Sequence, residues 1–220
     1  MNEINSVPGT MYSTVMARAN QMKTVSWTTQ ASFTLNDGSV VPAGTALTGV
    51  PYSQLTQCNA IEFLTYYNSG TSNGFYSVHP RGNYYDATYG VDCSGFVSKA
   101  WGIPRDTTSG FVSELYSANS SKYEKVGTYT LTSSSSTTGV SSSSLTASYP
   151  YLAATCAVVR INSNGGHAML VLSNSASTNK CSFLEAHNNF PEQVTYTYTQ
   201  LANMNYCPFS VKTRYFNQYN

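Results

Sequence analysis

The sequence predicts an α+β fold in which helices occupy the first part of the chain and a sheet occupies the last part. Apolar residues recur at helical spacing in several segments before residue 117. The last third instead contains short apolar or alternating runs, separated by connections of hairpin length. Consecutive strands with such short connections pair antiparallel. We therefore expect an antiparallel sheet of five or six strands, with extra helices on its N-terminal side.

The N-terminal part is expected to form two helices with extended segments between them. Residues 11–25 have apolar side chains at helical spacing, and the second helix is expected to open at Pro51 with Ser53 as its cap. Extended segments are expected at 25–29 and at 32–41, and a polar loop at 68–73. An Asn-Asp-Gly turn is expected within the second extended segment, at residues 36–38. The second helix is expected to turn four residues mostly toward the core: Leu55, Cys58, Ile61 and Phe63.

Two short helices are expected in the middle of the chain. Residues 93–101 place their apolar side chains on one helical face, with Asp92 at the N-cap position and Gly102 at the end. A further helix is expected over residues 108–116.

The remaining chain is expected to hold one long loop and the strands of the sheet. Residues 128–148 are almost all Ser and Thr, which predicts a surface loop within one domain. We expect a single domain over 1–220, with 1–48 as an N-terminal extension. The expected strands are 156–161, 167–172, 181–187, 194–198 and 209–216.

The composition argues against two classes of function. Hydrophobic residues make up 41% of the chain, which is typical of a globular protein, but only 10% of residues are charged. The net charge is +1 without a basic stripe, so the signature of a nucleic-acid binder is absent. No run approaches the roughly 18 apolar residues that a membrane span needs. The sequence does not indicate an oligomeric state.

The start of the chain and the polar composition give an expectation about localisation. Residues 1–10 lack a charged segment followed by an apolar run, so no signal peptide is visible. The polar surface must come from Ser, Thr, Asn, Gln and 18 tyrosines, a composition common in extracellular proteins. We expect a mature or trimmed chain that is extracellular or associated with the cell wall.

The number and spacing of the cysteines leave their redox state open. An odd count fits one special thiol with up to two disulfides, and it fits five reduced thiols equally well. No pair has the CxxC spacing of a structural zinc site, and we expect neither a metal nor another cofactor. The five are Cys58, Cys93, Cys156, Cys181 and Cys207.

Cys93 and His167 have the surroundings that a nucleophile and its base require. Cys93 begins a predicted helix, where the helix dipole and free backbone N–H groups favour a thiolate and an oxyanion. His167 follows Gly165 and Gly166 at the start of a predicted strand, which would fix its ring beside open space.

The next strand supplies a candidate for the third member of a triad. In a hairpin centred near residue 176, Glu185 would lie opposite His167 and accept its ring N–H. His187 lies two residues further on the same face of the strand, and it is the alternative orienting residue or a residue of the substrate site.

These candidate residues lie in three segments with a familiar order. Residues 92–97 read DCSGFV, residues 165–172 read GGHAMLVL, and residues 183–186 read FLEA. In this order they resemble the nucleophile motif, the base motif and the third polar residue of the NlpC family of papain-like cell-wall peptidases. Residues 49–52, Gly-Val-Pro-Tyr, resemble a further segment that precedes the nucleophile in that family, which makes Tyr52 a candidate substrate-binding residue.

The resemblance implies a fold, a substrate and further site residues. The fold would be papain-like, with the nucleophile helix packed on the antiparallel sheet. The substrate would be peptidoglycan, cleaved in its stem peptides between D-glutamate and a diamino acid. Asp92 and Ser94 would help to hold the free amine of the substrate, although helix capping is an equal explanation for Asp92.

The chain also departs from the family pattern. The third residue of the family is often His, whereas Glu185 stands here; the related CHAP amidases use Glu followed closely by Asn, and Asn188 and Asn189 are near. Tyr52 lies far before Cys93, so Tyr84 or Tyr85 is an alternative for its place.

Three rival functions remain open at this point. The first is an amidase or acyltransferase with the same catalytic residues. The second is a catalytically inert cell-wall-binding module. The third is a metal site formed by Cys93, His167 and His187.

Overall fold

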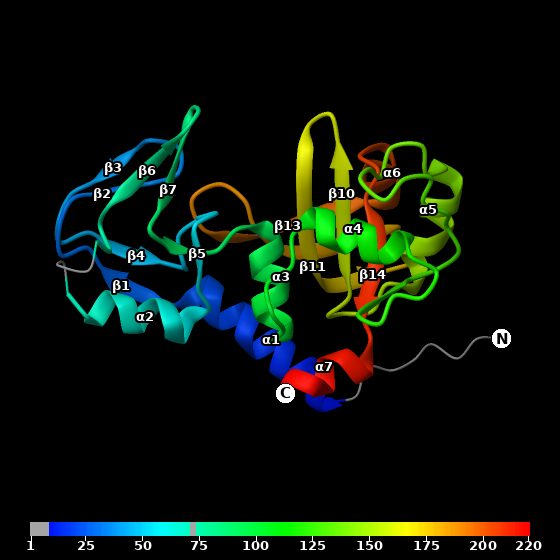
Figure 1. The fold of residues 1–220 in the computed structure, drawn as a ribbon, viewed down its shortest axis with the longest axis horizontal. Coiled ribbons are helices and arrows are strands. Elements are labelled where there is room, and N and C mark those ends of the chain that lie inside the picture. Colours follow the sequence, from blue (N-terminus) through cyan, green and yellow to red (C-terminus); the bar gives the residue numbers. More distant parts are fainter. Residues whose placement is uncertain (1–8, 71–73) are drawn as a thin grey trace.

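The computed structural model describes residues 9–70 and 74–220, and Figure 1 shows its elements grouped on either side of helix α3 (Cys93–Trp101). Small two-stranded sheets and helix α2 (Ala60–Asn68) lie on one side. A six-stranded sheet lies on the other. Helix α1 (Gly9–Thr24) packs against both α3 and α2, and buried residues from both sides belong to one hydrophobic cluster. The predicted first helix is confirmed. Residues 1–8, which belong to the segment searched for a signal peptide, and residues 71–73 of the predicted loop lie outside the described residues.

The extended segments after α1 form two short strand pairs around an aromatic core. β1 (Ser26–Thr28) pairs with β4 (Ala46–Thr48), and β2 (Phe33–Thr34) pairs with β3 (Val40–Val41). The predicted turn at 36–38 is confirmed, since Gly38 has φ 85° and its amide donates to Leu35 O at 2.9 Å. The ring of Trp27 packs edge-on against four other aromatic rings, which are Phe33, Phe63, Tyr67 and Phe75.

The second helix begins later than the sequence predicts. Asn59 caps α2 in a capping box with Glu62, so the helix starts at Ala60 and not near Ser53. Because α2 starts later, a different set of side chains faces the core. Cys58 and Phe63 are buried as predicted. Leu55 and Ile61 are instead 47% and 69% exposed.

The segment that precedes α2 instead runs beside the chain that leads to Cys93. β5 (Thr56–Gln57) pairs in parallel with β8 (Tyr89–Gly90), and a bridge joins Tyr52 to Val91. Gly90 is required here, because a Cβ at this position would lie 2.3 Å from the carbonyl oxygen of Pro51. The hairpin of β6 (Val78–Arg81) and β7 (Tyr84–Ala87), which the sequence did not predict, connects these parts.

The two helices predicted in the middle of the chain are confirmed. α3 begins at Cys93 after its N-cap Asp92 and ends at Gly102, which has φ 69°. α4 (Thr108–Tyr116) follows and is capped by Thr107. Both helices pack against strands of the six-stranded sheet.

The Ser/Thr-rich segment is more ordered than a surface loop. It contains α5 (Ser142–Ser148), capped by the hydroxyl of Ser141. Its few large residues are buried, among them Tyr129, Leu131 and Leu145. The prediction of a loop over the whole of 128–148 is therefore wrong, because these apolar anchors fold the segment onto the protein.

The sheet has the predicted antiparallel pairing and six strands. The order across it is β13-β12-β11-β10-β14-β9. The edge strand β9 was not predicted, and the predicted last strand ends at Val211 and gives way to α7 (Thr213–Tyr219). Helix α6 (Tyr198–Asn203) and the short 3-10 helix η2 (Tyr149–Tyr151) complete the C-terminal part. The strands are β9 (Tyr123–Lys125), β10 (Ala157–Asn162), β11 (Gly165–Ser175), β12 (Lys180–Ala186), β13 (Pro191–Thr197) and β14 (Cys207–Val211).

The register of the β11–β12 hairpin differs from the prediction by two residues. Leu170 pairs with Leu184, which places position 167 across from position 187 and not from Glu185. The turn lies slightly further along the chain than residue 176, and a bulge between Val171 and Ser173 shifts the pairing again.

No helix in the described residues is both long enough and apolar enough to span a membrane.

Candidate active site

Helix α3 presents Cys93 at its first turn, in the position that stabilises a thiolate. Cys93 is 7% exposed. The Asp92 side chain accepts the amide of Gly95 at 2.6 Å, while the amides of Cys93 and Ser94 have no hydrogen-bond acceptor among the described residues. These two N–H groups are therefore available to an oxyanion beside the sulfur.

His167 reaches the same place from strand β11. It pairs with Arg160 across β10 and β11, and it is 6% exposed. The preceding Gly166 allows α4 to approach, because a Cβ at this position would lie 2.3 Å from the hydroxyl oxygen of Thr108. Gly166 thus makes room for a neighbouring helix beside the histidine, whereas a Cβ at Gly165 would meet nothing within 4 Å.

Cys93, His167 and Glu185 form a connected triad. The ring Nε2 of His167 lies 2.6 Å from Oε2 of Glu185, and both residues are buried. The Cys93 side chain also acts on the His167 ring as a hydrogen-bond partner and raises its pKa. Glu185 reaches the ring diagonally across the strands, since His167 is not its direct cross-strand partner. The order sulfur, imidazole and carboxylate is the one that nucleophilic catalysis requires.

The surroundings of His167 favour its protonated form. Burial by itself lowers the pKa of His167, but the hydrogen bonds with Cys93 and Glu185 outweigh burial and raise this pKa to about 9. The positive ring then lies between the Cys93 side chain and the Glu185 carboxyl group.

His187 lies next to the triad but outside the chain of hydrogen bonds. It is exposed, and its ring centre lies 5.1 Å from that of His167 at an interplanar angle of 61°. Burial of part of the ring and the charge of His167 lower the pKa of His187. Glu185, and not His187, is therefore the residue hydrogen-bonded to the base.

A titration of the histidines by proton NMR is expected to separate these two rings. His167 should remain protonated until about pH 9, whereas His187 should lose its proton below its ordinary value of 6.5. The spectrum of His187→Ala assigns the lower titration by its loss. A spectrum in which none of the three histidines keeps its proton to about pH 9 would contradict the hydrogen-bonded triad.

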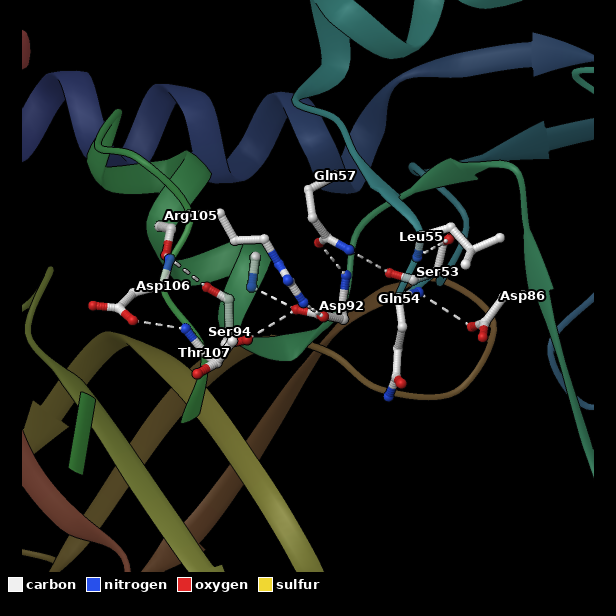
Figure 2. A network of polar contacts seen from close by, with 12 residues as sticks. Ser53, Gln54, Leu55, Gln57, Asp86, Asp92, Ser94, Arg105, Asp106 and Thr107 are labelled. Carbon is white, nitrogen blue, oxygen red and sulfur yellow. Dashed lines mark hydrogen bonds and ion pairs between the residues drawn. The ribbon is translucent and has the colours of Figure 1, made fainter. Parts of the chain in front are cut away.

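Asp92 and Ser94 are engaged within the protein, as Figure 2 shows. The Asp92 carboxylate accepts hydrogen bonds from the Gly95 amide at 2.6 Å and from the Ser94 hydroxyl at 3.0 Å, and it forms an ion pair with Arg105. Both Asp92 and Ser94 are buried. These contacts account for Asp92 as a helix cap, and its role toward a substrate amine stays a prediction.

Tyr52 lies beside the segment that leads to the nucleophile. Burial, followed by the negative charge of Cys93, raises the pKa of Tyr52 to about 12. Its hydroxyl accepts a hydrogen bond from Gln54 Nε2 at 3.2 Å. The alternatives Tyr84 and Tyr85 lie on the β6–β7 hairpin, where Tyr84 packs under Arg81. The charge of Cys93 acts on Tyr52, and a role of Tyr52 toward a substrate stays a prediction.

Asn189 fixes the loop after β12 to the N-terminal part. Its side chain accepts the amide of Asp37 at 3.1 Å and donates to the Asp37 carboxylate at 2.8 Å. Its carbonyl oxygen accepts the amide of Tyr52 at 2.8 Å. The segment predicted as an N-terminal extension therefore supports the rim of the site, while Asn188 bonds Glu192.

All five cysteines are free thiols and are buried. Burial raises the pKa of Cys58, of Cys181 and of Cys207 to about 12 in each case, and it also raises the pKa of Cys156. Of the two patterns that the sequence allowed, the structure has the one without disulfides.

Iodoacetamide at about pH 6 is expected to label Cys93 and to leave the other four thiols unmodified, because a thiolate is the reactive form. Peptide mass spectrometry after a short reaction measures the site of labelling. We expect a preference of about 100-fold or more for Cys93. Labelling of a core cysteine at a comparable rate would contradict an activated Cys93.

The predicted rival metal site of Cys93, His167 and His187 does not assemble. Among the described residues, the side chains of metal-binding type that gather within 4.8 Å are instead Glu185, His187 and Glu192.

Two residues at the site were missed from the sequence. Arg105 pairs with Asp92, and Gln57 accepts the amide of Asp92 at 2.9 Å through its side chain while donating to Ser53 O at 2.8 Å. Figure 2 shows this network on both sides of Asp92. The chain has only 11 lysine and arginine residues, and Arg105 follows the helix that Asp92 caps. This was the available signal that Arg105 could pair with Asp92. No local pattern marks Gln57.

Comparisons with protein-family models, with curated proteins and with solved structures find no match to this chain.

Proposed function

We propose that this protein is a cysteine hydrolase that cleaves an amide bond. The observation that carries the proposal is the connected triad, in which His167 bonds both Cys93 and Glu185, the latter at 2.6 Å, at the N-terminus of α3. Each member was expected from a different segment of the sequence, and chance packing rarely aligns a thiol, an imidazole and a carboxylate in catalytic order.

The proposed mechanism uses the groups in this order. The Cys93 thiolate attacks the amide carbonyl carbon, and the free amides of Cys93 and Ser94 stabilise the oxyanion. His167 gives its proton to the leaving amine, which departs as the thioester forms. His167 then takes a proton from water, the hydroxide attacks the thioester, and the acid is released as the Cys93 thiolate leaves, with His167 protonated as at the start. Glu185 orients His167 and stabilises its positive form.

We further propose a papain-like arrangement and a cell-wall substrate. The packing of α3 against β11 and β12 supports the first, since it sets the nucleophile helix on an antiparallel sheet. The resemblance of residues 92–97 and 165–172 to the NlpC motifs supports the second. Such a substrate places the protein outside the cell or at the cell wall, and the bond would lie in the stem peptides of peptidoglycan.

Mass spectrometry of muropeptides tests this function. Purified peptidoglycan is incubated with the wild-type protein and with Cys93→Ala, and the soluble fragments are compared. New fragments with the wild type alone would support the proposal, and their masses identify the bond. Without fragments, release of amines from a panel of other amides would indicate the amidase or acyltransferase function, and inertness together with an unreactive Cys93 would indicate a binding module.

A further inference from the structure

Three side chains with metal-binding atoms converge at the end of strand β12, next to the triad. One ligand atom each from Glu185, His187 and Glu192 lies within 4.8 Å of the others. Glu185 and Glu192 face each other by strand register, since they are direct partners across β12 and β13. His187 follows Glu185 by two residues and so projects to the same side. The sheet holds two of the donors in place before any ligand binds.

The charge of Glu192 has no partner of opposite sign. Glu185 is paired with His167 through Oε2, but Glu192 forms no ion pair within the described parts of the chain. Its Oε1 accepts a hydrogen bond from Asn188 Nδ2 at 3.1 Å. Like charges directly opposite each other on neighbouring strands destabilise a sheet. A cation between the two carboxylates would remove this repulsion.

The surroundings leave the cluster accessible on one side. Glu185 is buried, Glu192 is half-buried and His187 is exposed, which gives a path from solvent. The positive groups that act on His187 are His167 and Arg160. The positive charge of Arg160 disfavours the binding of a metal cation nearby. The guanidinium of Arg160 also interacts with the ring of Tyr206, whose centre lies 5.3 Å away.

We propose that Glu185, His187 and Glu192 bind one divalent transition-metal ion, with Zn²⁺ as the best fit. One imidazole nitrogen with two carboxylate oxygens is a donor set that Zn²⁺ accepts, in tetrahedral geometry at about 2.0–2.2 Å, with water in the fourth position. Mg²⁺ prefers oxygen donors alone in octahedral geometry. The three donor atoms already lie within 4.8 Å of one another.

Occupancy of this site is expected to inhibit the triad, a consequence that rests on the proposed function. Glu185 belongs to both sites, so the ion draws on the carboxylate that holds His167. The base is then oriented less well, and Cys93 should react more slowly. The metal site itself does not depend on which bond the protein cleaves.

Calorimetric titration of the Cys93→Ala protein with ZnCl₂ tests binding separately from activity. We expect one ion per chain, with affinity lowered about 10-fold or more by adding Glu192→Gln, because a ligand is lost. Glu124→Gln, a matched change of an exposed glutamate on β9, should leave the affinity unchanged. MgCl₂ should bind far more weakly. His187→Ala provides a second test if Glu192→Gln unfolds.

The outcomes separate the two proposals. No zinc binding, or equal binding with and without Glu192 and His187, would overturn the metal site whatever the activity. In the wild type, zinc should slow iodoacetamide labelling of Cys93 by about 10-fold, and Glu192→Gln should relieve this. Equal slowing in both proteins would place the ion on Cys93 and His167 directly and would also overturn the proposal.

Discussion

Cys93→Ala is expected to lower hydrolysis of the substrate by about 10⁴-fold or more, because no other group of the site can form the thioester. The residual rate would come from oxyanion binding and substrate positioning alone. Release of soluble muropeptides over time, measured by chromatography with mass detection, gives this ratio. The fold should be preserved, since the change removes one atom at the start of a capped helix, and the free energy of unfolding should fall by no more than about 1–2 kcal/mol.

Cys58→Ala is the matched control. It makes the same change at a fully buried thiol whose pKa burial raises to about 12. Its turnover should stay near that of the wild type even if some stability is lost to the small cavity. Cleavage by Cys93→Ala at a rate near that of Cys58→Ala would remove Cys93 from the mechanism.

The parts of the fold that could be predicted are those with complete local signals. α3 has an acidic N-cap, a continuous apolar face and a C-terminal glycine, and it begins and ends where the sequence indicates. The apolar runs of the C-terminal part likewise predicted five strands that are present, although their ends differ and the last one stops at Val211. In both cases the local preference and the packing require the same structure.

The predictions of secondary structure were wrong where two local signals competed, or where a contact distant in sequence determined the structure. Ser53 and Asn59 are both typical helix caps, and the capping box with Glu62 selects Asn59. Ser53 instead donates to the carbonyl of Ala87 at 2.6 Å, a partner 34 residues away that no local pattern reveals. The low-complexity segment folds because scattered residues such as Leu145 find room in the core, which composition alone does not show.

The candidate site was predicted by residue type more reliably than by geometry. Cys93, His167 and Glu185 come together as expected, yet the register that suggested Glu185 was two residues off. Glu185 still reaches His167, because a two-residue shift in register keeps side chains on the same face of a strand. The contacts of Asp92 with Arg105 and Gln57 depend on tertiary packing, and so they could not be derived from spacing.

Glu185→Gln is expected to lower turnover by about 10²- to 10⁴-fold, because the amide keeps the shape of the side chain but loses the charge that stabilises protonated His167. The pKa of His167, about 9 in the wild type, should fall for the same reason. The rate of iodoacetamide labelling of Cys93 at about pH 6 provides a readout that does not depend on the identity of the substrate, and it should fall as well.

His187→Ala is the discriminating comparison, because His187 is the alternative orienting residue and its ring lies 5.1 Å from that of His167 without a hydrogen bond to it. Its effect on Cys93 labelling should stay below about 10-fold, which is the range of an indirect contact. A loss in His187→Ala that equals or exceeds the loss in Glu185→Gln would assign the third catalytic role to His187. The hydrogen bond of 2.6 Å between Glu185 and His167 would then be structural.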